Sequence, residues 1–339
     1  MLLSDFDYEL PEELIAQEPL AARGASRMLV VSRERNDFRD ELFANFHQLI
    51  RPGDCLVLNN TRVFPARLHG RRNHIDGAEV EVFLVRATAN DTIWRALVRP
   101  AKRVRTGDRI LFDSDLEAEV LTEGEFGERT LQFHSPEPLA ELFDRLGQVP
   151  LPPYIHRPPR DSDRERYQTV FAEKRGSVAA PTAGLHFTSE MLENCQEAGA
   201  RIARVTLHVG LGTFAPLREQ ELANIQLHEE FFEIDAEQAA VLREASRLLC
   251  IGTTSVRTIE TAALRGGLVP MQGETNLFIS PGFRFRATQA LLTNFHLPQS
   301  SLLILVSAFS GRELILSAYR HAVAEKYRFF SYGDCMLIE

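Results

Sequence analysis

The hydrophobic pattern of the sequence changes twice along its 339 residues, and this change constrains the fold more than any other feature. Residues 1–59 and 151–339 alternate short apolar runs, typical of strands, with stretches of helical period. Residues 60–150 contain mainly short strand-like segments between turns. Because the two outer regions resemble each other, we expect a discontinuous α/β domain of residues 1–59 and 151–339, with residues 60–150 inserted as a second domain.

The inserted region predicts a small antiparallel β-barrel. Turn-forming sequences such as Thr106-Gly107-Asp108 separate its segments, and short strands at regular spacing are typical of barrels and sandwiches. The strands are predicted at 63–68, 78–85, 92–98, 108–112, 116–121 and 129–133.

The outer regions predict a layered α/β/α domain, because strands and helices alternate along them. Helices are expected at 11–17, 41–50, 188–198, 235–246, 254–265 and 311–326. Strands are expected at 28–31, 55–58, 201–207, 229–234, 248–252, 276–279 and 302–306.

The sequence favours a cytoplasmic protein without a membrane anchor. Its first seven residues include acids and no basic region, unlike a signal peptide. The most apolar run, 301–309, is too short to cross a bilayer. Four scattered cysteines without a C-x-x-C pair argue against a disulfide framework and a zinc ribbon.

Charge is unevenly distributed along the chain. The net charge is -9, so the overall field does not indicate nucleic-acid binding. Residues 60–109 nevertheless carry eleven Arg and Lys against five acids, whereas residues 110–145 carry ten acids against two Arg. Such a split can form a basic stripe on one face of the inserted domain, and a well-solvated surface explains it equally well.

Five polar segments follow predicted strands of the α/β domain and predict one binding cleft. Ligands bind at the carboxyl ends of strands in open α/β sheets, and a cleft between two domains is a common site. The segments are 58–62, 176–188, 208–214, 252–257 and 293–298.

The segment 252–257 has the clearest local chemistry. A predicted strand runs into Gly252, and hydroxyl residues follow where a helix begins. Free amides at a helix N-terminus attract a carboxylate or phosphate, and Arg257 can add a forked partner. A plain capped helix explains the same pattern equally well.

Histidines in these segments suggest proton transfer rather than metal binding. His186, His208 and His296 lie beside glycines, hydroxyls or Asn294, where a group titrating near neutral pH is useful. No H-x-x-x-H or H-E-x-x-H pair is present, so we expect neither a metal nor a resident cofactor. P-loop, G-x-S-x-G and complete G-x-G-x-x-G motifs are also absent.

Several segments, taken in their order along the chain, resemble sequences of the family of S-adenosylmethionine:tRNA ribosyltransferase-isomerases. The resemblance covers nearly the whole chain. They are FDYELP (6–11), NNTRVFPARL (59–68), VPLPPYI (149–155), DRERYQTVF (163–171), PTAGLHFT (181–188) and YRFFSYGD (327–334). Departures are small: Cys335 replaces an expected small residue, and residues 299–301 are one of several variants.

The resemblance implies an enzyme of queuosine synthesis. Such an enzyme transfers and isomerises the ribosyl part of S-adenosylmethionine onto 7-aminomethyl-7-deazaguanine in a tRNA with a GUN anticodon. The products are epoxyqueuosine, adenine and methionine, so S-adenosylmethionine is a consumed substrate. A monomer is the expected state.

Residue roles follow from the resemblance as hypotheses. His186 or His208 is expected to act as the base or acid, with Thr182 beside it in the catalytic set. Thr182 is also expected to contact ribose or adenine, together with Asn294 and His296, and Ser255 and Arg257 are expected to capture the methionine carboxylate. Further substrate contacts are expected from Asn60, Arg62, Thr213 and Thr254, and tRNA phosphate contacts from Arg99, Lys102, Arg103 and Arg105.

Two other functions remain open from the sequence. The barrel can serve as a tRNA-binding module on a passive α/β scaffold, which S-adenosylmethionine binding would argue against. A methyltransferase would release S-adenosylhomocysteine, but no glycine-rich loop follows a first strand.

Overall fold

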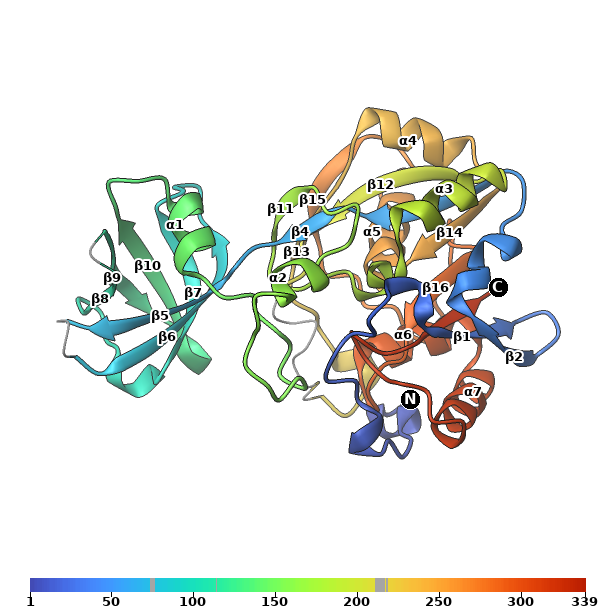
Figure 1. Cartoon of the computed structure of the whole chain (residues 1–339), viewed down its shortest axis with the longest axis horizontal. Coiled ribbons are helices and arrows are strands. Elements are labelled where there is room, and N and C mark those ends of the chain that lie inside the picture. Colours follow the sequence, from blue (N-terminus) through green and yellow to red (C-terminus); the bar gives the residue numbers. More distant parts are fainter. Residues whose placement is uncertain (74–76, 114, 211–216, 218) are drawn as a thin grey trace.

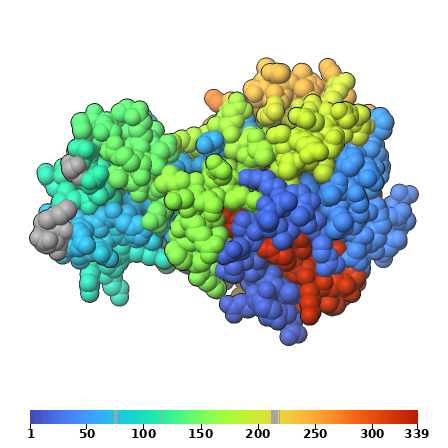
Figure 2. All heavy atoms as spheres, viewed as in Figure 1, coloured from blue at the N-terminus to red at the C-terminus, as the bar shows by residue number. Residues whose placement is uncertain are grey.

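The protein has two lobes, an α/β body and a smaller β-barrel (Figure 1). The structure is a computed structural model that describes residues 1–73, 77–113, 115–210, 217 and 219–339. Figure 2 shows a narrower waist between the lobes, with the green segment that follows the barrel lying across it. This arrangement agrees with a β-domain inserted into an α/β domain.

The body contains one nine-stranded mixed sheet. Its edge-to-edge order is β15 (Met271–Thr275), β13 (Glu230–Ile234), β12 (Arg201–Leu207), β3 (Asp54–Asn59), β14 (Arg247–Ile251), β16 (Ala290–Asn294), β17 (Cys335–Ile338), β1 (Arg27–Ser32) and β2 (Asp37–Leu42). The neighbours β12, β3, β14 and β16 run parallel. Their carboxyl ends therefore share one edge.

Helices cover both faces of this sheet. Cys55 and Val57 of β3 face a core formed with α4 (Ala236–Arg243), α5 (Thr253–Leu264), α6 (Ser301–Ser310) and α7 (Arg312–Ala324). Leu56 and Leu58 face the opposite core, with α3 (Ser189–Glu197) and the 3₁₀ helix η4 (Phe43–Leu49). Successive strand residues point to opposite faces, so β3 is apolar throughout. The predicted α/β/α layering is confirmed.

The second lobe is a closed antiparallel barrel. Its strand order is β10 (Glu128–His134), β7 (Ile93–Arg99), β6 (Glu79–Ala87), β5 (Arg67–Arg72), β8 (Arg109–Asp113) and β9 (Leu116–Glu123). Helix α1 (Leu139–Leu146) follows, and its Leu142 and Phe143 pack into the barrel core. The predicted barrel is confirmed, and all its strands lie inside the span 60–150.

Backbone pairing ties the two lobes together. The strand β4 (Thr61–Val63), which leads into the barrel, pairs in parallel with β11 (Lys174–Ser177), which follows the return path. On that return path, α2 (Asp163–Arg166) supplies Arg164, which donates to the carbonyls of Asp144 and Gly147 at 2.8 Å each. The barrel is therefore held to the body at its entrance and exit.

Some predicted elements are wrong. The run 302–306 lies in α6, not in a strand, and Ser300 caps this helix by accepting from the amide of Leu303 at 3.2 Å. A helix apolar on all sides gives no helical period, so its sequence imitates a buried strand. The expected strand 276–279 is replaced by β15 just before it, and the expected helix 11–17 is reduced to the turn Glu12–Leu14.

A buried carboxylate fixes the strand that carries Asn294. Glu260 of α5 is 0% exposed and accepts from the amides of Arg286, Ala287 and Thr288 at 2.8, 3.0 and 2.7 Å. These three residues lead into β16. The position of β16 therefore depends on a side chain from a neighbouring helix.

We predict that Glu260→Gln lowers the free energy of unfolding by about 1–3 kcal/mol, because one buried acceptor becomes a donor facing another donor. Urea unfolding followed by circular dichroism measures the effect. The control is Glu237→Gln, at an exposed glutamate of α4, which should change the free energy of unfolding by less than about 0.5 kcal/mol. Equal stability of the two variants would contradict this role.

Candidate active site

The carboxyl edge of the parallel strands gathers the predicted polar segments. His208 follows β12, Asn59 ends β3, Gly252 follows β14, and Asn294 ends β16. The remaining segment forms the 3₁₀ helix η7 (Thr182–His186), which contacts β16. The described parts of the predicted polar segments therefore lie along one edge of the sheet.

A cavity of about 350 Å³ lies beside the end of β16. Small-ligand pockets commonly measure about 300–1,000 Å³, so this one is large enough for a nucleoside. Three predicted residues, Thr182, Asn294 and His296, line it. Its walls are largely apolar and include the rings of Tyr154 and Phe330, whose centroids are 4.2 Å apart.

Asn294 is held in one orientation. Its Nδ2 donates to His186 Nε2 and to the carbonyl of Phe330, both at 3.1 Å, with the carbonyl of Asp334 at 3.4 Å. A carbonyl only accepts, so Nδ2 and Oδ1 cannot be exchanged. Among the described residues the buried Oδ1 has no hydrogen-bond partner.

Both ring nitrogens of His186 are occupied. Because Nε2 accepts from Asn294, the proton lies on Nδ1, which donates to Ser26 Oγ at 2.8 Å. Burial, together with the nearby charge of Arg328, lowers the pKa of His186 to about 4. At neutral pH the imidazole is therefore uncharged and fixes the amide of Asn294.

His296 is also buried and firmly placed. Its Nε2 lies 2.9 Å from Thr293 Oγ1, its amide donates to the Tyr319 hydroxyl at 3.0 Å, and its carbonyl accepts from the Tyr8 hydroxyl at 2.5 Å. Burial lowers the pKa of His296 to about 3. The ring is thus neutral at physiological pH.

His208 lies on another part of the same edge. Its Nδ1 is 2.8 Å from Thr61 Oγ1, and its ring stacks on Phe231 with centroids 5.5 Å apart. Burial lowers the pKa of His208. Three strand spacings separate β12 from β16, which is about 14 Å, so His208 and Asn294 belong to different parts of the site.

The residues at the end of β3 are largely engaged within the protein. Asn60 accepts from Thr206 Oγ1 at 2.8 Å and donates to Glu173 at 3.2 Å. Arg62 is exposed on β4. Thr213, another predicted substrate contact, lies outside the described residues. Of this group, Arg62 has the most accessible side chain.

The N-terminus of α5 retains free polar groups. Gly252 has a φ of 88°, a conformation that favours glycine, and no side chain caps the helix. Ser255 Oγ donates to the carbonyl of Ile251 at 2.9 Å, whereas Thr254 Oγ1 has no partner among the described residues. Ser255 Oγ is therefore already used, and Thr254 Oγ1 is a buried polar atom of this terminus that remains without a partner among the described residues.

Arg257 forms an internal ion pair instead of a free fork. Its Nη1 donates to Glu230, and its Nε donates to the carbonyl of Leu277 at 3.1 Å. Both charged side chains are about 5–6% exposed. Glu230 also accepts from the amide of Gly210 at 2.8 Å, so the pair joins α5 to the segment after β12.

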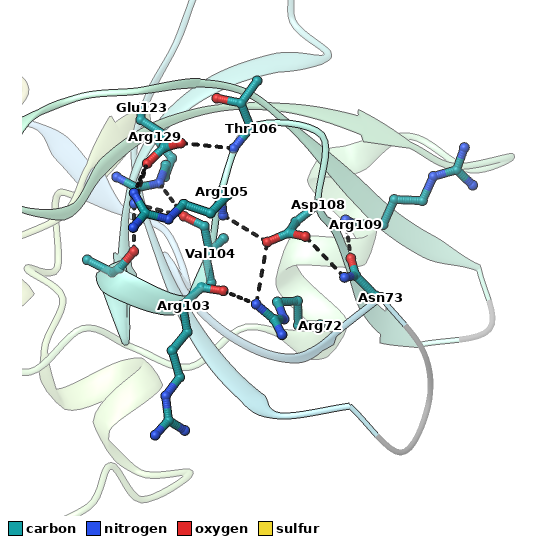
Figure 3. A network of polar contacts seen from close by, with 11 residues as sticks. Arg72, Asn73, Arg103, Val104, Arg105, Thr106, Asp108, Arg109, Glu123 and Arg129 are labelled. Carbon is teal, nitrogen blue, oxygen red and sulfur yellow. Dashed lines mark hydrogen bonds and ion pairs between the residues drawn. The ribbon is translucent and has the colours of Figure 1, made fainter.

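The basic residues predicted to contact tRNA lie on the barrel and are all exposed. Arg105 pairs with Glu123 at 3.1 Å, whereas the Arg103 side chain points away from the surrounding network (Figure 3). Buried Arg129 donates to the carbonyls of Ala101 and Val104 at 2.7 and 2.8 Å. It therefore shapes the turn that presents Lys102 and Arg103.

The sequence reasoning missed several residues at the cavity. The Tyr154 hydroxyl and Ser331 Oγ are 2.5 Å apart, and both residues line it. Their segments, 149–155 and 327–334, carry the family resemblance, which was the available signal. Ser26 gave no such signal, because only folding places it beside His186.

The described residues contain no group of three or more His, Cys, Asp or Glu able to hold a metal ion. No single helix among them is long and apolar enough to cross a membrane. The pair α6 and α7 reaches that length and character only together, and it is bent by 118°.

The fold and site define a two-domain α/β enzyme with a nucleoside-sized cavity at the strand ends. A family model described as "Queuosine biosynthesis protein" matches residues 3–338. The S-adenosylmethionine:tRNA ribosyltransferase-isomerases of Solibacter usitatus and Symbiobacterium thermophilum are 57% and 50% identical, each over the full length of both chains. A crystal structure of S-adenosylmethionine tRNA ribosyltransferase from Thermotoga maritima is 39% identical, covers 99% of this chain and 100% of its own, and has a TM-score of 0.58.

The chain therefore belongs to the queuosine biosynthesis protein family, that of the S-adenosylmethionine:tRNA ribosyltransferase-isomerases. The resemblance inferred from its motifs is confirmed, and so is its class as a transferase enzyme.

We predict that His186 makes stability depend on pH. The unfolded histidine binds a proton near pH 6.5, but the folded one binds it only near pH 4. Its contribution is therefore complete above pH 6.5 and is lost as the pH falls toward 4. Between pH 7 and 5 the loss from this residue is about 2 kcal/mol.

Urea unfolding at both pH values tests this. Between pH 7 and 5, His186→Gln should lose about 2 kcal/mol less of its free energy of unfolding than the wild type does. The control is His156→Gln, at a side chain that is 64% exposed, and its loss of stability should equal that of the wild type. An unchanged pH dependence in His186→Gln would contradict the assignment.

Proposed function

We propose that this enzyme transfers and isomerises the ribosyl group of S-adenosylmethionine onto 7-aminomethyl-7-deazaguanine in tRNA, forming epoxyqueuosine and releasing adenine and methionine. The observation that carries the proposal is the convergence of Thr182, Asn294 and His296 on one cavity. Full-length relatives named for this activity support it.

The reaction uses the acidity that a sulfonium gives to its neighbouring C5′ hydrogens. A base removes one of them, the resulting ylide opens the ribose, and adenine is expelled. The substrate amine then attacks, and methionine leaves as the epoxide closes. The protein must therefore supply a base, hold the adenine, and keep the methionine carboxylate in place.

His208 is the better candidate for the base of the two predicted histidines. Both nitrogens of His186 are engaged with Ser26 and Asn294. For His208 only Nδ1 has a hydrogen-bond partner among the described residues, the hydroxyl of Thr61. His208 also lies near β4, the strand that contains Thr61 and leads into the barrel. A tRNA amine approaching between the lobes would reach this side first.

The methionine carboxylate fits the N-terminus of α5. This terminus follows β14, which lies between β3 and β16 in the sheet, so the anion would lie beside the adenine cavity. The uncapped helix amides suit a carboxylate, as does the Thr254 hydroxyl, which has no partner among the described residues. Arg257 contributes positive charge from within its pair with Glu230.

The barrel is the proposed tRNA-binding surface. Arg99, Lys102, Arg103 and Arg105 are exposed, and Arg99 borders a second cavity of about 280 Å³ next to the segment Pro150–Pro153. The target guanine lies in a GUN anticodon loop, where unstacking a base costs least. We propose that the enzyme acts as a monomer in the cytoplasm, where its four free cysteines stay reduced.

The reaction of purified protein with S-adenosylmethionine and tRNA containing 7-aminomethyl-7-deazaguanine tests the function. We expect adenine, methionine and epoxyqueuosine by mass spectrometry. A methylated nucleoside with S-adenosylhomocysteine would identify a methyltransferase instead. Tight tRNA binding without any product would identify a binding module.

We also predict that Arg99→Ala, Lys102→Ala and Arg103→Ala each weaken tRNA binding and reduce the slope of log affinity against log salt by about 0.7–0.9. Each phosphate contact releases counterions, which produces that slope. Fluorescence anisotropy between 50 and 200 mM salt measures it.

The control is Arg145→Ala, which removes an arginine of α1 that pairs with Glu137. This variant should keep the wild-type slope of log affinity against log salt. Unchanged slopes in all three variants would place the tRNA elsewhere.

A further inference from the structure

Three histidines reach this edge of the sheet. Judged by the described residues, only one of them lines the cavity and also has a ring nitrogen without a hydrogen-bond partner. His186 has both nitrogens occupied, and His208 does not line the cavity beside β16. His296 lines that cavity, and its Nδ1 makes no hydrogen bond within the described part of the chain. Its Nδ1 is therefore available to a ligand.

The position of the His296 ring is fixed before any ligand binds. Two tyrosine hydroxyls hold its backbone on both sides, and Thr293 holds Nε2. Groups that are already oriented stabilise a transition state without a reorganisation cost. This arrangement is typical of a catalytic side chain rather than of a filler in the core.

The hydroxyl of Thr293 determines where the imidazole proton lies. Within the described part of the chain, His296 Nε2 is the only hydrogen-bond partner of Thr293 Oγ1. A buried hydroxyl proton needs an acceptor, so Thr293 donates to Nε2. The neutral ring consequently carries its proton on Nδ1 and presents a donor to the cavity.

The cavity walls suit a purine. The rings of Tyr154 and Phe330 and the chain at Pro298 provide flat apolar surfaces, which favour an aromatic base. Asn294 lines the same cavity, and its buried Oδ1 has no partner among the described residues. The donor at His296 Nδ1 is complementary to the ring nitrogens of adenine.

We propose that His296 is a catalytic residue whose Nδ1–H binds a ring nitrogen of the adenine in S-adenosylmethionine and stabilises the base as it departs. This inference rests on the proposed function, since it assigns one step of that reaction. It adds a role that differs from proton removal at C5′.

Adenine leaves by cleavage of its bond to the ribose. When the C1′–N9 bond breaks, its electron pair moves into the adenine ring and negative charge develops on the ring nitrogens. The hydrogen bond from Nδ1 stabilises that charge, and His296 keeps its proton. The proton that makes neutral adenine is the one first removed from C5′ by the base.

Two isosteric substitutions separate the two ring nitrogens. His296→Asn places an amide where Nδ1 lies and loses the contact with Thr293, whereas His296→Gln reaches Thr293 and loses the Nδ1 donor. We expect His296→Gln to lower kcat by about a hundredfold, as for other donors to developing charge. His296→Asn should retain at least about a tenth of wild-type kcat, and KM for S-adenosylmethionine should change less than kcat.

Deaza analogues provide the second readout. Replacing N3 or N7 of adenine by carbon removes one possible acceptor, so one of the two analogues should slow the wild type strongly and His296→Gln only slightly. Thermal melts and S-adenosylmethionine binding show whether each variant is folded.

Three results would each overturn the role of His296. His296→Gln could keep the wild-type kcat, or His296→Gln and His296→Asn could lose kcat equally. The deaza analogues could also slow the wild type and His296→Gln by the same factor. If the wild type releases no adenine at all, the proposed function itself fails.

Discussion

The arrangement of the site depends on the buried amide of Asn294. Its two Nδ2 protons are shared among His186, Phe330 and Asp334, so one side chain at the end of β16 holds η7 and the loop before β17. Asp334 extends this connection, because its carboxylate accepts from the amides of Arg27 and Arg328 at 2.9 and 2.8 Å. Removing the amide would release segments that are far apart in the sequence.

The order of the strands arranges the proposed steps of the reaction in space. In the proposed arrangement the adenine cavity lies at the end of β16, the carboxylate binds at the α5 N-terminus after β14, and His208 follows β12. Adjacent strands are about 4.8 Å apart, so a molecule of the length of S-adenosylmethionine can contact several strand ends. In the proposed reaction the parallel edge would act as a series of subsites, and β3 leads through β4 to the barrel (Figure 1).

The sequence predicted the layers and the barrel because both depend on local pattern. Apolar runs such as 55–58 indicate a strand buried on both faces, and Gly252 before hydroxyl residues indicates a strand-to-helix turn. The segment 302–306 was mispredicted because α6 is buried on all sides and lacks a polar face. The locations of the polar loops were predictable, but the partners of their side chains were not.

Those partners come from distant parts of the chain. Ser26 binds His186 across 160 positions, and Glu230 pairs with one nitrogen of Arg257. Glu123 likewise occupies Arg105, which a count of charges along the sequence treats as free. Only folding reveals which functional side chains are available and which are already engaged.

A crystal structure of the enzyme with bound S-adenosylmethionine tests the central claim most directly. The account predicts that the adenine ring lies in the cavity beside Asn294 and His296, with the methionine carboxylate at the N-terminus of α5. A ligand with its adenine outside this cavity, or with its carboxylate remote from Thr254, would contradict the account.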